Sequence, residues 1–293
     1  MSEYIAAWRS RSRLSPPRWL RQFARHPGAV CGALILALIL AMALSAGYFY
    51  PKDPLRIVAM PEIWPFTDAR YPLGTDSLGR DIAALIVHGA RSTLLIGLAA
   101  SLTATGIGVS VGASAAWFGG WVDETLMRIA ELFQVIPNVV FVLTIVSVLG
   151  PHMGNIIIAV ALVSWQPIAR LTRAEFLSWR EREFVLACRA SGMAGSQIVI
   201  REILPNVLPP VIVMASLVVA GAILYESVVS FLGLGDPNLA SWGRLVGEGR
   251  TLIRSSWYIC AVPGVAIMLA VLALNLVGDG LNDALNPKLR GRE

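Results

Sequence analysis

The side chains that could perform chemistry are few and scattered along the chain. A phosphate-binding loop for ATP hydrolysis needs Gly-Lys followed by Ser or Thr, but the only lysines, Lys52 and Lys288, each follow a proline. His26, His88 and His152 lie in or beside separate apolar stretches, so no Ser, His and Asp set can be inferred. The sequence therefore predicts no catalytic residue and no cofactor bound by this chain.

The cysteines and histidines also give no metal-binding pattern. Cys31, Cys188 and Cys260 are far apart, which provides neither a disulfide framework nor the spacing of metal ligands. His88 has no nearby His or Cys partner. We expect the cysteines to be small apolar fillers rather than redox groups, and we expect no metal site.

A charged segment between two long apolar stretches is the most regular feature. Small and apolar residues recur there at helical spacing: Phe184, Leu186, Ala187 and Ala190. This pattern predicts a short helix that begins near Glu183 and ends at Gly192. A second helix is expected to begin at Pro205, because a first turn does not need the missing N–H. We interpret the unit as a docking element, not a catalytic one.

The composition is that of a membrane protein. The 293 residues are 56% hydrophobic and 15% charged, whereas soluble proteins carry about 25% charged residues. The net charge of +5 could indicate nucleic-acid binding, but the basic residues lie in the gaps between apolar stretches, as in membrane proteins. We therefore expect a lipid bilayer as partner and no nucleic acid.

Six apolar stretches predict an all-α, polytopic protein with six transmembrane helices. The expected parts are a basic cytoplasmic arm with an interfacial helix, a first span, an extracytoplasmic loop, a core domain of five spans that contains the docking loop 170–204, and a cytoplasmic tail: residues 1–26, 27–51, 52–91, 92–279 and 280–293. A cleaved signal peptide is the alternative for 27–51, but the apolar stretch is too long for one. A nucleic-acid-binding arm is the alternative for residues 1–26.

Within the core domain, three local features carry expectations. Asp123, Glu124 and Arg128 indicate a short loop, and the apolar stretch 132–169 should break at Gly150-Pro151, with its second helix continuing through Arg170. A ladder of small residues at steps of four predicts close helix packing rather than a pore lining; it comprises Ala100, Ala104, Gly108, Gly112 and Ala116. We expect Glu226 to be hydrogen-bonded at the outer interface rather than to be a substrate ligand.

Two extracytoplasmic loops contain dense turn signals. In the first, Gly74 and Gly79 allow tight turns, and Asp76 and Asp81 can accept hydrogen bonds from turn amides. We favour a self-satisfied turn there over a surface for a binding protein. In the second, glycines and a tryptophan predict a re-entrant or interfacial turn, with the ring at the level of the lipid headgroups; these residues are Gly233, Gly235 and Trp242, and glycines Gly278 and Gly280 should end the last span.

The distribution of positive charge predicts the orientation. Two thirds of the 24 lysines and arginines lie in the terminal segments, the loop after the second span and the docking loop. The positive-inside rule places that side in the cytoplasm. Both termini and the docking loop are therefore expected to be cytoplasmic.

The docking segment resembles the "EAA" loop of bacterial ABC-importer permeases. Ala187-Cys188 stands for the family's small pair, and Gly192, Leu204 and Pro205 match, while Leu186 replaces the family's Glu. Glu202, where the wider family often has Ile, points to the dipeptide/oligopeptide/nickel branch, which four further stretches also resemble: Tyr71–Asp81 with Gly89–Ser92, Ser230–Gly235, Ser241–Gly243 and Asn275–Pro287.

The resemblance implies the C-type permease subunit and the type I ABC-importer transmembrane fold. It implies a second, similar permease chain, two cytoplasmic ATPase subunits that bind ATP and Mg, and an extracytoplasmic solute-binding protein, in the bacterial inner membrane. The implied coupling residues are Glu183, Phe184, Ala187, Cys188, Arg189, Ala190, Gly192, Leu204 and Pro205. The extracytoplasmic family motifs are Gly74, Asp76, Gly79, Arg80, Asp81, Gly233, Gly235 and Trp242.

Peptides are the plainest implied substrate, with nickel, opines or glutathione as alternatives within the branch. An intramembrane hydrolase would need paired acids or a histidine-rich site inside the spans, and the spans lack both. A channel would work alone and would not need a docking helix. We therefore expect a transport subunit that works by alternating access, in which the helix around Glu183 transmits the movement of the ATPases.

Overall fold

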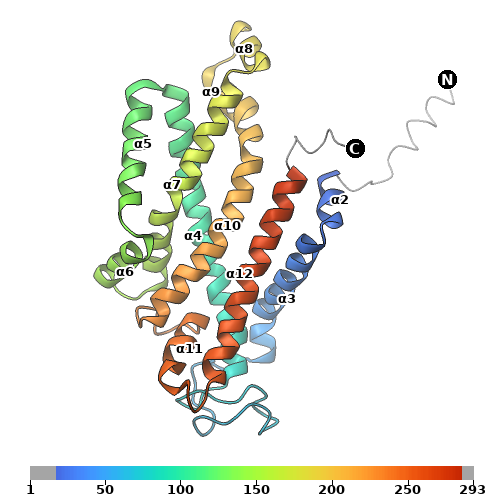
Figure 1. Ribbon diagram of the computed structural model, residues 1–293, viewed down its shortest axis with the longest axis vertical. Helices are drawn as coiled ribbons and strands as arrows, with labels where there is room; N and C mark the ends of the chain where they lie inside the picture. The colour runs from blue at the N-terminus through green and yellow to red at the C-terminus, as the bar shows by residue number, and fades with distance from the viewer. Residues whose placement is uncertain (1–17, 286–293) are drawn as a thin grey trace, which may run out of the picture.

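The computed structural model describes residues 18–285, and these are mostly helical (Figure 1). The arm 1–17 and the tail 286–293 lie outside the described residues. The helices are α2 (Arg18–Arg25), α3 (Pro27–Phe49), α4 (Ile82–Phe118), α5 (Gly120–Val135), α6 (Asn138–Leu149), α7 (Met153–Arg180), α8 (Glu183–Ala190), α9 (Gly195–Gln197), α10 (Leu204–Phe231), α11 (Trp242–Gly249) and α12 (Tyr258–Leu285). A π-helical turn, Ile198–Ile203, joins α9 to α10, and a 3₁₀ turn, Arg250–Leu252, follows α11.

Five helical segments within residues 18–285 are long and apolar enough to cross a membrane, and a sixth span is a bent pair. The five are α3, α4, α7, the continuous segment Gly195–Phe231 and α12, and the pair is α5 with α6, bent by 87°. The bend lies at Ile136-Pro137, where proline supplies no N–H for an unbroken helix. The predicted all-helical membrane fold is confirmed, and the third span is broken.

Two predicted loops are wrong in their extents. The loop expected around Asp123 is the first turn of α5, and the chain turns instead at Gly119 and Gly120, both with positive φ. The loop expected to reach Arg91 ends at Asp81, because that carboxylate caps α4 ten residues earlier. As predicted, α7 continues past Arg170.

The ladder of small residues on α4 packs against α7, as predicted. Ala100, Ala104 and Ala116 are buried. A Cβ added at Gly108 would lie 2.7 Å from Cβ of Ile168, so the two helices can approach this closely only with glycine there. These contacts make α4 and α7 the centre of the bundle.

Functional segments gather at two opposite ends of the bundle (Figure 1). At one end α8 projects beyond the other helices, and α2 and the end of α12 lie on that side. At the other end lie the segment between α3 and α4 and the helix α11. In α12, Gly278 and Gly280 do not end the helix as predicted; it continues to Leu285, and Gly280 packs on Phe23 and Ala29 instead.

Candidate functional sites at the two ends of the bundle

The helix α8 has the bounds that the sequence predicts. Glu183 lies in its first turn and Arg189 in its last, which suits the positive and negative ends of the helix dipole. At the other end Gly192 has φ +79°, its N–H donates to the carbonyl of Arg189 at 3.0 Å, and the N–H of Met193 donates to that of Cys188 at 3.1 Å. This is the Schellman arrangement, so Gly192 ends α8 by its left-handed conformation.

One residue anchors α8 to its own chain. Val185 is fully buried and packs in a cluster with Ile198 and Ile203, while Cys188 and Met193 are half-buried against it. Around this anchor, Arg182 lies 5.4 Å from the ring of Trp179, and aromatic contact continues to Phe184. The underside of α8 is therefore fixed to the ends of α7 and the π-helical turn.

Arg189 ties α8 to the end of α4. Its guanidinium lies 5.4 Å from the ring centroid of Trp117, a geometry in which the cation is attracted to the aromatic face. A Cβ on Gly195 would lie 2.8 Å from the same ring. Trp117 is thus held between α8 and the beginning of α9.

The opposite face of α8 is exposed, and only the ring of Phe184 contacts another side chain there, that of Trp179. It presents Phe184, 37% exposed, and Leu186, 52% exposed, next to the small residues Ala187 and Ala190. Apolar side chains with small neighbours form a surface into which another protein can pack closely. Most of the predicted coupling residues therefore lie together here; Cys188 and Arg189 face the chain's own helices, and Leu204 and Pro205 lie further along.

Leu204 and Pro205 do not start a new helix, which corrects the prediction. The helix begins at Gly195, passes through a π-helical turn and enters α10 at Leu204, whose N–H donates to the carbonyl of Val199. Pro205, Pro209 and Pro210 lack N–H groups, so the preceding carbonyls must find other donors. The wider turn accommodates this loss, and the helix continues from the docking segment into the membrane.

At the opposite end, the first loop closes on itself through Asp76. One carboxylate oxygen accepts from the N–H groups of Leu78 and Arg80 at 2.9 and 2.8 Å, and the other accepts from Nε of Arg80 at 2.5 Å. Gly74 and Gly79 have φ of +78° and +80°, and each lies against loop backbone that leaves no room for a side chain. The predicted hydrogen bonds to turn amides are present.

Arg80 joins this loop to α11. Arg80 is 3% exposed, and its partner Asp76 is fully buried. Arg80 also forms an ion pair with Glu248, and Glu248 forms a second ion pair with Arg244 at 2.8 Å. Two arginines and two carboxylates thus neutralise one another in a network across the loop and α11. Each of the buried charges is compensated, as burial requires.

Asp81 caps α4 and is buried, with 8% of its surface exposed. It accepts from the N–H of Ala83 at 2.9 Å, which satisfies one of the free donors at the helix start. Burial raises the pKa of its carboxyl above the usual range, and the backbone hydrogen bonds of the cap act against that rise. Nearby, Nε2 of His88 lies 3.0 Å from the carbonyl oxygen of Tyr50, and no metal-binding group of side chains occurs among the described residues.

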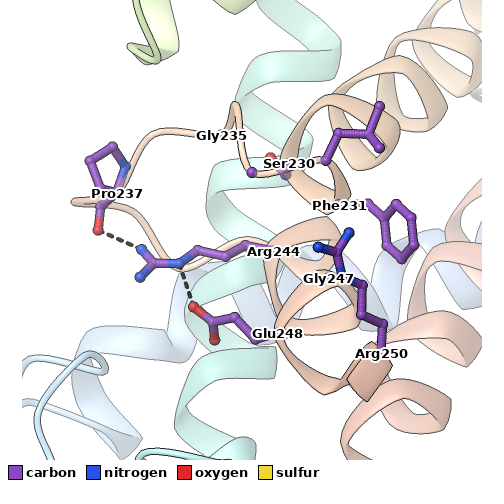
Figure 2. Close-up of a pocket in the computed structure, with 10 residues that line it drawn as sticks. Ser230, Phe231, Gly235, Pro237, Arg244, Gly247, Glu248 and Arg250 are labelled. Atoms are coloured by element: carbon purple, nitrogen blue, oxygen red, sulfur yellow. Dashed lines mark hydrogen bonds and ion pairs between the residues drawn. The ribbon is translucent and has the colours of Figure 1, made fainter. Parts of the chain in front are cut away.

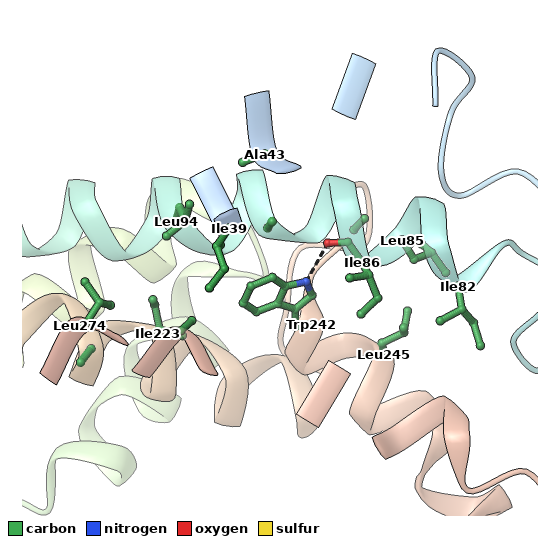
Figure 3. Packing of buried hydrophobic residues seen from close by; sticks show 14 of the residues in the cluster. Ile39, Ala43, Ile82, Leu85, Ile86, Leu94, Ile223, Trp242, Leu245 and Leu274 are labelled. Atoms are coloured by element: carbon green, nitrogen blue, oxygen red, sulfur yellow. Dashed lines mark hydrogen bonds between the residues drawn. The ribbon is translucent and has the colours of Figure 1, made fainter. Parts of the chain in front are cut away.

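Trp242 is buried rather than at headgroup level, which corrects the prediction. It is 1% exposed, and its Nε1–H donates to the carbonyl of Ile86 at 2.9 Å (Figure 3). Gly89 permits this packing, since a Cβ there would lie 2.7 Å from the indole. Glu226 is also buried, at 1% exposure, and it accepts the predicted hydrogen bond, from Ser230 at 2.7 Å.

A pocket of about 280 Å³ lies where α10 turns toward α11 (Figure 2). Gly233, with φ +84°, ends α10 there, and Gly235 packs against Ser230. Figure 2 shows Arg244 and Glu248 on one side and Arg250 on the other, where Arg250 lies 5.6 Å from the ring of Phe231. The remaining predicted family motifs therefore border a single hollow at this end of the bundle.

Comparison with known proteins identifies the family. Residues 105–291 match the model of the binding-protein-dependent transport system inner membrane component, and residues 18–69 match the N-terminal transmembrane domain of oligopeptide transport permease C. The di/tripeptide transport system permease protein DppC of Pseudomonas aeruginosa is 37% identical over 92% of this chain and 91% of its own. The dipeptide transport system permease protein DppC of Alkalihalophilus pseudofirmus is 36% identical over 92% and 89%.

A solved structure supports the fold. A chain of the MetNI methionine ABC transporter in an inward-facing conformation is 19% identical, with a TM-score of 0.57 over 69% of this chain and 96% of that chain. At this identity the likeness concerns the fold alone, which is that of a type I ABC importer. The extent of the family match over the core domain and the end-to-end similarity to permeases show that this chain belongs to the family of binding-protein-dependent transport system inner membrane components and is a multi-pass ABC-importer permease subunit.

Proposed function

We propose that this permease moves di- or oligopeptides across the bacterial inner membrane. The support is the naming of its relatives in Pseudomonas aeruginosa, Alkalihalophilus pseudofirmus and Haemophilus influenzae as dipeptide or di/tripeptide permeases, at 32–37% identity over most of their length. Nickel, opines or glutathione remain the alternatives from the same branch. Uptake of labelled dipeptides by the assembled transporter, with each alternative solute as competitor, tests this assignment.

The proposed assembly contains a second permease chain, two ATP-binding subunits on the cytoplasmic side and an extracytoplasmic solute-binding protein. Both termini are assigned to the cytoplasm, because α2, the end of α12 and α8 lie at one end of the bundle and that end carries most of the basic residues. ATP and Mg bind to the partner subunits in this proposal, and the permease itself performs no catalysis.

The observation that carries the proposal is the exposed face of α8. It projects from the bundle, is anchored by the buried Val185 and is followed, after the turn at Gly192, by the continuous helix Gly195–Phe231 that contains α10. A surface with this attachment can pass a displacement of a bound ATPase to a membrane-spanning helix. Alternating access then follows, in which ATP hydrolysis by the partners supplies the free energy that shifts the conformational equilibrium.

Two substitutions in the assembled transporter test this coupling. Gly192→Pro forbids the positive φ that ends α8, and Ala187→Arg places a large cation on its exposed face. Both should abolish the stimulation of ATPase activity by transported solute. Met60→Arg should preserve it, because Met60 is 79% exposed in the segment between α3 and α4, at the other end of the bundle. Wild-type stimulation in both α8 variants would refute the coupling role.

A further inference from the structure

Arg170 is an exposed cation inside a membrane-spanning helix. It lies within α7, and its guanidinium donates to the side-chain oxygen of Gln134 at 2.9 Å. Among residues 18–285 no carboxylate pairs with it, whereas Arg173, one turn nearer α8, pairs with Asp123 at 2.5 Å. A charged side chain at such a position is costly in lipid and belongs toward water or an anionic group.

Three further polar side chains continue from Arg170. Gln134 and Asn138 stand on either side of the break at Ile136-Pro137, and both are exposed. The amide of Asn138 donates to the hydroxyl of Tyr225 on α10 at 3.1 Å. We name Arg170, Gln134, Asn138 and Tyr225 the polar strip. Its two hydrogen-bonded pairs join α5 to α7 and α6 to α10.

The polar strip runs along the bundle between its two ends. With a rise of about 1.5 Å per residue, Arg170 lies about 15 Å before the end of α7, on the side of α8. By the same measure Tyr225 lies about 9 Å before the opposite end, at the end of α10. Gln134 and Asn138 lie between them, at the bend of the broken span. Each side chain retains donors or acceptors beyond the hydrogen bond described above.

We propose that the polar strip lines the water-filled translocation pathway and that Arg170 binds a carboxylate of the passing solute. A guanidinium and a carboxylate form charge-assisted, paired hydrogen bonds, and Gln134, Asn138 and Tyr225 offer partners for amide groups. This inference rests on the proposed function and adds the residues of the pathway to it. Hydration of the pathway accounts for the exposure of Arg170, Gln134 and Asn138 and the partial exposure of Tyr225.

Cysteine accessibility tests the pathway without any assumption about the solute. In the assembled transporter, Asn138→Cys and Tyr225→Cys are treated with a charged methanethiosulfonate, and the reaction of the native Cys31, Cys188 and Cys260 is measured in the unsubstituted transporter and subtracted. The control is Leu38→Cys, on α3, 64% exposed in the isolated chain. A thiol that faces lipid has a raised pKa, and a rise of one unit lowers its reactive thiolate fraction about tenfold. The strip cysteines should therefore react about tenfold faster than the cysteine at position 38, or faster still. Equal rates would overturn the proposal.

Transport of paired peptides tests the role of Arg170. The probe is one dipeptide with a free C-terminal carboxylate and the same dipeptide with a C-terminal amide. Arg170→Gln should slow the free acid about tenfold through loss of a charge-assisted hydrogen bond, slow the amide little, and be partly rescued by Arg170→Lys. An unchanged ratio of the two rates would overturn this role. If the wild type moves no peptide while strip cysteines still react quickly, the peptide assignment fails and the pathway stands.

Discussion

The indole N–H of Trp242 donates to the carbonyl of Ile86 at 2.9 Å, which fixes the start of α11 against the second turn of α4 (Figure 3). The two residues are separated by 156 positions in the sequence. The contact is possible because Gly89 leaves room for the indole. The segment after α10 is therefore part of the core of the bundle and not a loose loop at the membrane surface.

Gly89→Ala should destabilise the protein. The added Cβ would lie 2.7 Å from the indole of Trp242, and overpacking of this kind costs about 1–3 kcal/mol. The matched control is Gly106→Ala on the same helix, where nothing lies within 4 Å of the added atom; its higher helix propensity should leave stability unchanged or raise it by up to about 1 kcal/mol. Thermal unfolding of the purified protein in nanodiscs measures both. Equal melting temperatures would contradict the packing argument.

Arg80→Met should strongly destabilise the folded protein. It removes the cation that compensates the fully buried Asp76 and also releases Glu248, and breaking a buried ion pair costs about 3–5 kcal/mol. Arg70→Met is the control in the same loop, because its pair with Asp68 is exposed to solvent and screened. We expect a large fall in melting temperature for the first variant and none for the second. Asp76→Asn combined with Arg80→Met should recover part of the loss, since no uncompensated charge then remains.

Asp81 should contribute a pH dependence of defined sign. Burial raises the pKa of its carboxyl in the folded state, so the folded protein binds the proton more tightly than the unfolded chain does. This contribution to stability is complete below the ordinary aspartate pKa, about 4, and is lost as the pH rises through the raised folded-state pKa. Asp81→Asn keeps a capping side chain and cannot ionise.

Melting temperatures of the wild type and Asp81→Asn, measured from pH 4 to neutral pH, test this sign. The difference between them should move in favour of the asparagine variant as the pH rises. Asp81→Ala controls for the cap: loss of the capping hydrogen bond should lower the free energy of unfolding by about 1 kcal/mol at every pH. A difference that moves in favour of the wild type with rising pH would show that the cap, rather than burial, dominates the pKa of Asp81.

Local signals in the sequence predict the bounds of α8 but not its continuation. Gly192 ends the helix by a backbone conformation that its own type determines, so the signal is complete within a few residues. Pro205 misleads because a proline suits the first turn of a helix and also follows a π-helical turn. Which of the two occurs depends on the packing of Ile198 and Ile203 against α7, and that information is not local.

The same limit applies to the burial of individual residues. The Gly and Trp composition around Trp242 is typical of an interfacial turn, and the burial of the ring depends on a glycine far away in the chain. The depth of Glu226 along α10 follows from helix rise, but its burial follows from neighbouring elements. By contrast, the ladder through Gly108 predicts its own contact, since small residues at steps of four serve close packing.

Two truncations can distinguish the role of the buried, anchoring face of α8 from the role of its exposed face. Val185 is fully buried and Leu186 is 52% exposed. Val185→Ala should loosen the attachment of α8 to α7 and the π-helical turn by about 1–2 kcal/mol, less than the 2–5 kcal/mol typical of larger residues. Faster hydrogen exchange of the α8 amides in the isolated permease should reveal this, whereas Leu186→Ala should leave that exchange unchanged.

In the assembled transporter the two variants should differ again. Leu186→Ala removes apolar surface from the proposed contact with the ATPase, so it should weaken retention of that subunit during purification. Val185→Ala leaves the exposed face intact, so the ATPase should be retained while solute-stimulated hydrolysis falls, because a loosely attached helix transmits less of its displacement to α10. If Leu186→Ala instead accelerated exchange in α8 and left ATPase retention unchanged, the exposed face would serve the internal packing of the chain and not a partner.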